Sequence, residues 1–140
     1  MNITNEAKST IAEASPTIET RQERSRQLAL AAARTAEDHR GQEIVVLDMR
    51  GMTTEFDYFV LVTGNSRRQL HAISEEIDRV LESDLNDERS GIEGYHESRW
   101  ILLDYGSVVI HLFDAETRTY YALEDLWGAA QRIPLPWQTT

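Results

Sequence analysis

Two apolar runs separated by a short polar stretch dominate the last third of the chain. Residues 100–103 and 108–113 are rich in Ile, Leu, Val and aromatic residues, which favour β-strands. The intervening Asp104-Tyr105-Gly106-Ser107 is typical of a tight turn. Because apolar residues occupy consecutive positions in both runs, we expect a β-hairpin near the middle of a sheet that is covered on both faces.

The first half of the chain shows one helical pattern and two strand patterns. Residues 21–39 are Ala-rich and favour a helix, with Leu28, Ala32 and Ala36 at helical spacing. Short apolar runs within 42–48 and 58–63 have the length and composition of buried strands.

A second helix is predicted directly after residue 66. Ser66 and Gln69 have the spacing of a capping box, in which each side chain binds a free backbone amide. The residues that follow place their apolar members on one helical face, namely Leu70, Ile73, Ile77, Val80, Leu81 and Leu85.

The remaining segments complete the expected fold. Residues 94–97 are expected as a short strand and residues 114–118 as one helical turn. The order of elements predicts a single α/β (α+β) domain with a mixed sheet flanked by helices. We expect a flexible tail over residues 1–20, the domain over 21–130 and an extended tail over 131–140, where two prolines interrupt regular structure.

Charge and composition narrow the classes of function. The net charge of −10 argues against direct binding to nucleic acid, which requires clustered positive charge, but favours encounter with a basic partner. The chain has no cysteine, which excludes thiolate chemistry. It shows no apolar run of about 18 residues and no secretory or transit pattern, so we expect a cytoplasmic protein.

Two segments could carry catalytic chemistry. Gly64-Asn65-Ser66 lies between a strand and a helix, where nucleotidyltransferases hold a nucleotide, but no suitable pair of carboxylates for metal ions follows on a strand. Asp104 and His111 lie on facing strands and could act as an acid–base pair, but no nucleophile accompanies them. We favour structural roles in both cases, and the scattered histidines predict no metal site.

The last third of the chain also concentrates residues that are frequent in protein interfaces. Trp, Tyr and Arg dominate interface hot spots. For Trp127 we favour a place in the core, whereas Trp100, Arg118 and one tyrosine are candidates for a contact surface. The whole set consists of Trp100, Tyr105, Arg118, Tyr120, Tyr121, Glu124 and Trp127.

Several short motifs occur in an order that resembles the ribosomal silencing factor family, also called Iojap-like. The resemblance extends over about residues 25–130. The motifs are Asp57-Tyr58-Phe59-Val60, Thr63-Gly64-Asn65-Ser66-Arg67-Arg68-Gln69, Glu93-Gly94, Trp100-Ile101-Leu102-Leu103-Asp104-Tyr105-Gly106, Val109-Ile110-His111-Leu112-Phe113, Arg118-Thr119-Tyr120-Tyr121 and Leu123-Glu124-Asp125-Leu126-Trp127.

The resemblance implies a non-enzymatic factor, without cofactor, whose fold is similar to nucleotidyltransferases but lacks their active site. Members bind the large-subunit ribosomal protein numbered fourteen at the intersubunit face, block subunit joining and lower translation when nutrients are short. Free members are often dimeric, so a homodimer is an open expectation. The resemblance makes Trp100, Asp104, His111, Arg118 and Tyr121 the candidate contacts. A nucleotide-binding transferase and a self-pairing scaffold remain as alternatives.

Overall fold

The computed structural model describes residues 17–122, 125 and 127–138. The predicted N-terminal tail therefore lies mostly outside the described residues. The helices are α2 (Ile18–Asp38), α3 (Arg67–Leu85) and α4 (Ala115–Tyr121). The strands are β1 (Gln42–Asp48), β2 (Tyr58–Gly64), β3 (Gly91–Glu93), β4 (Trp100–Asp104), β5 (Val108–Asp114) and β6 (Gln131–Ile133).

The strands form one six-stranded sheet in the order β3-β4-β5-β2-β1-β6. The central strands β2 and β5 are parallel, and every other pair is antiparallel. This arrangement confirms the predicted single α/β domain with a mixed sheet. The likeness to nucleotidyltransferases that the resemblance implies stays a prediction.

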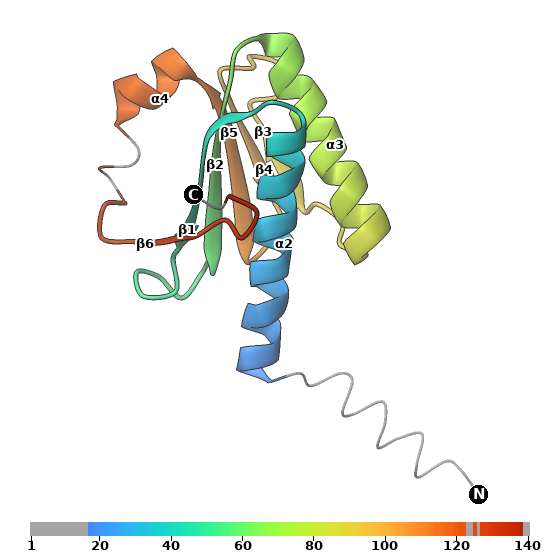
Figure 1. Ribbon diagram of the computed structural model, residues 1–140, viewed down its shortest axis with the longest axis vertical. Coiled ribbons are helices and arrows are strands. Elements are labelled where there is room, and N and C mark those ends of the chain that lie inside the picture. The colour runs from blue at the N-terminus through green and yellow to red at the C-terminus, as the bar shows by residue number, and fades with distance from the viewer. Residues whose placement is uncertain (1–16, 123–124, 126, 139–140) are drawn as a thin grey trace, which may run out of the picture.

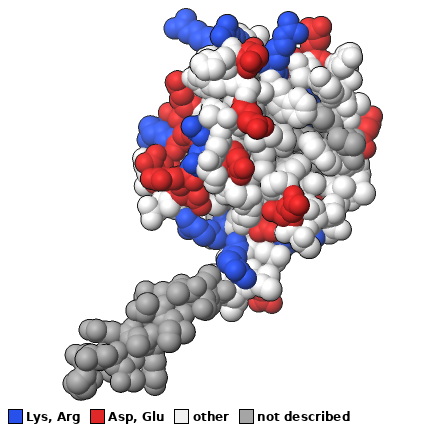
Figure 2. All heavy atoms as spheres, turned by 180° about the vertical axis from the view of Figure 1, so that it is seen from behind, with Lys and Arg blue, Asp and Glu red and all other residues white. Residues whose placement is uncertain are grey.

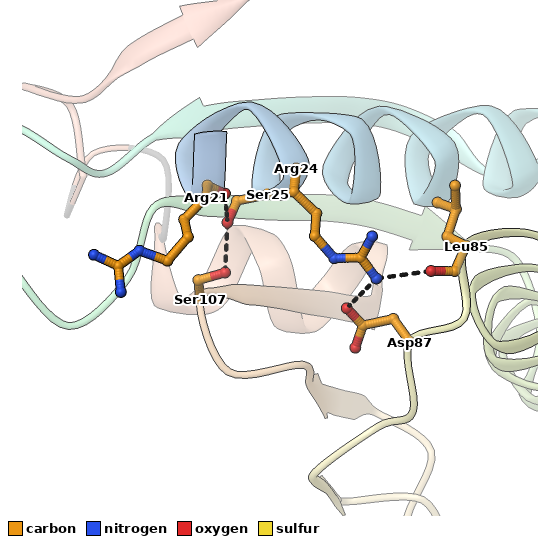
Figure 3. A network of polar contacts seen from close by, with 6 residues as sticks. All are labelled: Arg21, Arg24, Ser25, Leu85, Asp87 and Ser107. Carbon is orange, nitrogen blue, oxygen red and sulfur yellow. Dashed lines mark hydrogen bonds and ion pairs between the residues drawn. The ribbon is translucent and has the colours of Figure 1, made fainter. Parts of the chain in front are cut away.

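Helices α2 and α3 lie next to each other over one face of the sheet (Figure 1). The small side chains of α2 allow close packing, since Ala29, Ala32, Ala33 and Ala36 are all fully buried. At the start of α2, Ser25 Oγ lies 2.6 Å from Ser107 Oγ in the turn between β4 and β5 (Figure 3). Arg24 donates to Leu85 O at 2.7 Å, which links α2 to the end of α3.

The predicted cap of α3 is confirmed. Ser66 Oγ accepts a hydrogen bond from Gln69 N at 3.0 Å, and Gln69 Oε1 accepts one from Asn65 N at 2.6 Å. The Gln69 side chain also donates to Arg40 O at 2.9 Å. The Gly64-Asn65-Ser66 segment therefore acts as a turn and helix cap that joins α3 to the end of α2.

The predicted hairpin is also confirmed and consists of β4 and β5. Asp104 Oδ1 accepts a hydrogen bond from Gly106 N at 2.7 Å, and Gly106 has a φ of +85°, which glycine adopts without strain. Strand β5 is buried along nearly its whole length, as expected. Strand β4 is next to the short edge strand β3, and alternate residues of β4 are only half buried.

The strand expected at residues 94–97 was placed wrongly. The structure has a strand three residues earlier, at Gly91–Glu93, and the chain then turns. Gly94 has a φ of +76°, and a Cβ atom at this position would lie 2.0 Å from Trp100 O. The turn therefore requires glycine. The helical turn expected at 114–118 extends to Tyr121.

Residues 131–138, expected to belong to an extended tail, pack on the domain. Gln131–Ile133 pair with β1 as an edge strand, and Leu135 is buried. The Trp137 ring lies 5.2 Å from the Arg34 guanidinium, and Trp137 Nε1 donates to Glu37 on α2. Pro134 follows the strand directly, which is consistent with a short strand at a sheet edge.

Candidate partner-binding surface

The sheet face opposite α2 and α3 is built from alternate residues of the central strands. On β4, Ile101 and Leu103 point into the main core, while Trp100, Leu102 and Asp104 point to the opposite face. This second face carries a small core of its own, formed by Leu47, Met49, Phe59, Leu61, Val109 and Phe113.

A cluster of aromatic rings extends from this second core to the surface, and we call it the aromatic face. His111 lies at its centre, with ring centroids 4.8 Å from Phe59 and 5.4 Å from Trp127. Trp100 lies 5.4 Å from Tyr121 and 5.9 Å from Phe113, again between ring centroids. The aromatic face consists of Phe56, Phe59, Trp100, His111, Phe113, Tyr121 and Trp127.

His111 is a buried and neutral member of this cluster. Its side chain is 4% exposed, and burial lowers the pKa of the imidazole to about 4. Nδ1 accepts a hydrogen bond from Trp100 Nε1 at 3.2 Å, so the proton of the neutral ring is assigned to Nε2. Within the described residues, Nε2 has no hydrogen-bond partner.

Asp104 and His111 do not form the acid–base pair that was considered from the sequence. The register pairs Asp104 with Val109 and His111 with Leu102, so the two side chains are offset on the same face. Asp104 instead binds the turn amide of Gly106. The two residues border one hollow of about 450 Å³, which Phe56, Phe59, Leu102 and Val109 also line.

Tyr121 reaches the aromatic face from α4. Asp114 caps this helix, since its Oδ1 accepts a hydrogen bond from Thr117 N at 2.7 Å. Tyr121 is 54% exposed and Tyr120 is 80% exposed. Together with Arg99 and Trp100, these tyrosines border a second hollow of about 430 Å³.

Arg118 occupies a different place from the other four candidate contacts. Its side chain is 4% exposed and lies beneath α4. Nη1 donates to Glu43 O at 2.6 Å and to Thr63 Oγ1 at 2.9 Å, while the guanidinium carbon lies 5.4 Å from the Phe113 ring centroid. Arg118 therefore joins α4 to β1 and β2.

The structure thus brings Trp100, His111 and Tyr121 together and places Asp104 at the far end of β4, about 13 Å along the strand from Trp100. Phe56 and Phe59 belong to the same surface but were not predicted. Phe59 lies in a strand that is buried along its entire length, so no alternation of polar and apolar residues indicated which face it occupies. Glu124, from the predicted interface set, lies outside the described residues.

The described residues contain no group of three or more His, Asp or Glu side chains that could hold a metal ion. None of the helices in the described ranges is long and apolar enough to cross a membrane.

The mixed sheet, with two helices on one face and an aromatic cluster on the other, defines an α/β domain with a candidate protein-binding face. A sequence model described as "Ribosomal silencing factor during starvation" matches residues 22–140. The chain belongs to the ribosomal silencing factor family, as its motifs predicted. The match includes residues 131–140, which the motif-based resemblance did not reach.

Three relatives illustrate the range of the family. The ribosomal silencing factor RsfS of Bacillus subtilis is 43% identical over 100 residues, which are 71% of this chain and 83% of that protein. The crystal structure of protein CV0518 from Chromobacterium violaceum has a TM-score of 0.70 at 30% identity and covers 81% of this chain and 92% of that chain. Chloroplastic protein Iojap of Arabidopsis thaliana is 34% identical over 79% of this chain and 45% of that protein.

The family is a group of non-enzymatic regulators that bind the large ribosomal subunit. They repress translation during starvation by blocking the joining of the subunits. Membership confirms the expected repression of translation by blocking of subunit joining, and it removes the nucleotide-binding transferase as an alternative.

Proposed function

We propose that this chain binds the large ribosomal subunit through the aromatic face and so keeps the small subunit from joining. The proposal rests on one observation: the aromatic cluster on one side of the sheet is only partly buried. The helices α2 and α3 pack over the other side, whereas Trp100 and Tyr121 remain partly accessible.

The aromatic face has the composition and shape of a protein-binding hot spot. Trp and Tyr contribute large contact areas when a partner covers them. Trp100 borders the hollow of about 430 Å³, and its indole is held in place by the hydrogen bond to His111 and by the Phe113 and Tyr121 rings. A side chain that is already ordered loses little conformational entropy on binding.

The partner that we propose within the large subunit is its protein numbered fourteen, at the face that meets the small subunit. Ribosomal proteins are generally basic, and this chain carries a net charge of −10. Asp104 and the exposed Glu93 border the hollow next to Phe59. Carboxylates at the edge of an apolar contact favour a basic partner and speed the encounter.

The five candidate residues take different parts in this proposal. Trp100 and Tyr121 are direct contacts, and Asp104 is a contact at the border of the surface. His111 and Arg118 are buried and act as positioning residues. His111 orients Trp100 through a hydrogen bond, and Arg118 holds α4, which contains Tyr121, against β1 and β2.

Two further expectations concern the free protein. We propose a cytoplasmic location, as for a factor that meets bacterial ribosomes. A homodimer that buries the aromatic face would compete with ribosome binding. Sedimentation of the free protein over a range of concentrations measures whether such a dimer forms.

Replacing Trp100 tests the proposal directly. Trp100→Ala should weaken binding to isolated large subunits by about 2 kcal/mol or more, because the variant lacks the anchor of the contact. Cosedimentation of the purified protein with large and small subunits separately measures the effect. We expect wild type to sediment with the large subunit alone.

Trp137→Ala is the matched control, because Trp137 packs on α2 at the opposite side of the sheet. This variant should bind large subunits as wild type does. The proposal is wrong if Trp100→Ala, with its circular dichroism spectrum unchanged, still binds with wild-type affinity.

A further inference from the structure

The hollow of about 450 Å³ on the aromatic face lies beside the edge strand β3, and we call it the Gly91 hollow. It lies on the side of His111 that faces the β4–β5 turn, whereas Trp100 lies on the other side of His111. The Gly91 hollow is therefore separate from the hollow that Trp100 borders. Its walls are mainly apolar and consist of Phe56, Phe59, Leu102 and Val109.

The hollow is open because β3 has a glycine at a position that faces it. The register pairs Gly91 with Asp104 and Glu93 with Leu102, so Gly91 and Glu93 both lie on the aromatic face. A Cβ atom at Gly91 would have no atom within 4 Å apart from its chain neighbours, and the φ of Gly91 is not positive. A larger residue at this position would therefore occupy the hollow without straining the backbone.

Two carboxylates line the hollow without a cationic partner. Glu93 is exposed and Asp104 is half buried, and neither forms an ion pair within the described residues. The two residues are diagonal neighbours on β3 and β4, which places their backbones roughly 7–8 Å apart. A single cation between the two side chains would therefore be close to both carboxylates.

This chain places no positive charge in the Gly91 hollow. None of the lining residues is Lys or Arg, and burial lowers the pKa of the His111 imidazole to about 4, so that ring is neutral. Arg99 lies at the other end of β4, about 16 Å along the strand from Asp104. The helices α2 and α3 lie in front of the sheet in Figure 1, and Figure 2, which views the opposite side, shows acidic side chains across the middle of the surface.

We propose that the Gly91 hollow receives a lysine or arginine side chain of the protein that the aromatic face binds, an inference that rests on the proposed function. The aliphatic part of this side chain packs against the apolar walls, and its charged end lies between Glu93 and Asp104. The faces of the phenylalanine rings add attraction for a cation. An apolar side chain would leave both carboxylates unpaired, and an acidic one would be repelled. The hollow therefore selects a basic residue.

Filling the hollow tests whether a side chain of the partner enters it. Gly91→Leu should weaken cosedimentation with isolated large subunits about tenfold or more, because the leucine side chain takes the space of the partner's residue. The matched control is Gly51→Leu. A Cβ atom at Gly51 also has no atom within 4 Å, and Gly51 does not line the hollow, so this variant should bind as wild type does.

Reversing one charge tests whether the entering side chain is basic. Glu93→Lys should weaken binding about fivefold or more beyond the effect of Glu82→Lys, because a cation at position 93 repels the partner's cation. Glu82 is exposed on α3, which packs over the other face of the sheet, so the two variants make the same change in net charge at different places. The difference between them should shrink at raised salt, which screens exposed charges.

Wild-type binding by Gly91→Leu, with its circular dichroism spectrum unchanged, would overturn the inference. Weakened binding by Gly91→Leu together with equal binding by Glu93→Lys and Glu82→Lys would also overturn it, because the hollow would then hold a side chain that is not basic. Either result leaves the proposed function intact if Trp100→Ala is still impaired. Absence of wild-type binding to large subunits, or wild-type binding by folded Trp100→Ala, would overturn both.

Discussion

At the scale of single residues, His111 shows how the aromatic face is kept in order. A second proton on the buried ring would go to Nδ1, which would remove the acceptor of the Trp100 hydrogen bond and place a charge in apolar surroundings. A neutral imidazole at Nδ1 is an acceptor that fixes the indole, whereas an imidazolium would be a donor. The geometry of the candidate anchor therefore depends on the protonation state of its neighbour.

This dependence predicts a loss of stability in mild acid. The pKa of His111 is lowered from 6.5 to about 4 by burial, so the unfolded chain binds a proton over this pH range that the folded chain does not. The free energy of unfolding should then fall as the pH drops below 6.5, by roughly 1 kcal/mol between pH 7.5 and 5.5 from this group alone. Urea denaturation at the two pH values measures it.

His111→Asn is the control for that experiment. Asn retains an acceptor close to the position of Nδ1 but does not titrate, so its stability should change by roughly 1 kcal/mol less than that of wild type. The other histidines are present in both proteins. Equal changes in the two proteins would show that His111 is not the group responsible.

The sequence predicted which candidate residues lie close together better than it predicted which of them are buried. Trp100, His111 and Tyr121 lie together because alternate residues of adjacent strands share a face, and the strand pattern was clear. Arg118 was predicted as a contact but is buried, because its partners Glu43 and Thr63 are far away in the sequence. Residue type alone does not distinguish an interface arginine from one that joins two elements.

At the scale of elements, α4 depends on a single buried side chain. Arg118 connects this short helix to β1 and β2, and the helix itself has only seven residues. An isolated helix of this length is not stable in water. The position of Tyr121 therefore depends on the contacts of Arg118.

Arg118→Met should lower the free energy of unfolding by about 2 kcal/mol, because the Glu43 carbonyl and Thr63 hydroxyl lose their buried donor. Amide hydrogen exchange should accelerate in α4 more than in β2 or β5. Arg79→Met is the control, since Arg79 forms an exposed pair with Glu76, and its effect on the free energy of unfolding should be much smaller. Equal effects of the two substitutions would contradict the role assigned to Arg118.

The long elements were predicted from the sequence more accurately than the short strands at the sheet edges. The helices α2 and α3 and the strands β1, β2, β4 and β5 carry sustained apolar patterns, and all were found close to their predicted positions. Strands β3 and β6 have only three residues each, too few to show a period. They form because β4 and β1 offer unpaired edges, which is a property of the assembled sheet.

At the scale of the whole molecule, the two faces of the sheet differ in how they are packed. One face carries α2 and α3 and contains most of the core, and the other carries a small second core with exposed rings. The face covered by helices thus forms a stable scaffold for the face that we propose as the binding surface.

The central claim is that the aromatic face blocks subunit joining, and a joining assay tests it most directly. Large subunits are incubated with wild type, Trp100→Ala or Trp137→Ala, small subunits are added, and joined ribosomes are measured on a sucrose gradient. The account predicts that wild type and Trp137→Ala keep the subunits apart, while joined ribosomes form in the presence of Trp100→Ala. Equal blocking by folded Trp100→Ala and wild type, or normal joining with wild type, would contradict it.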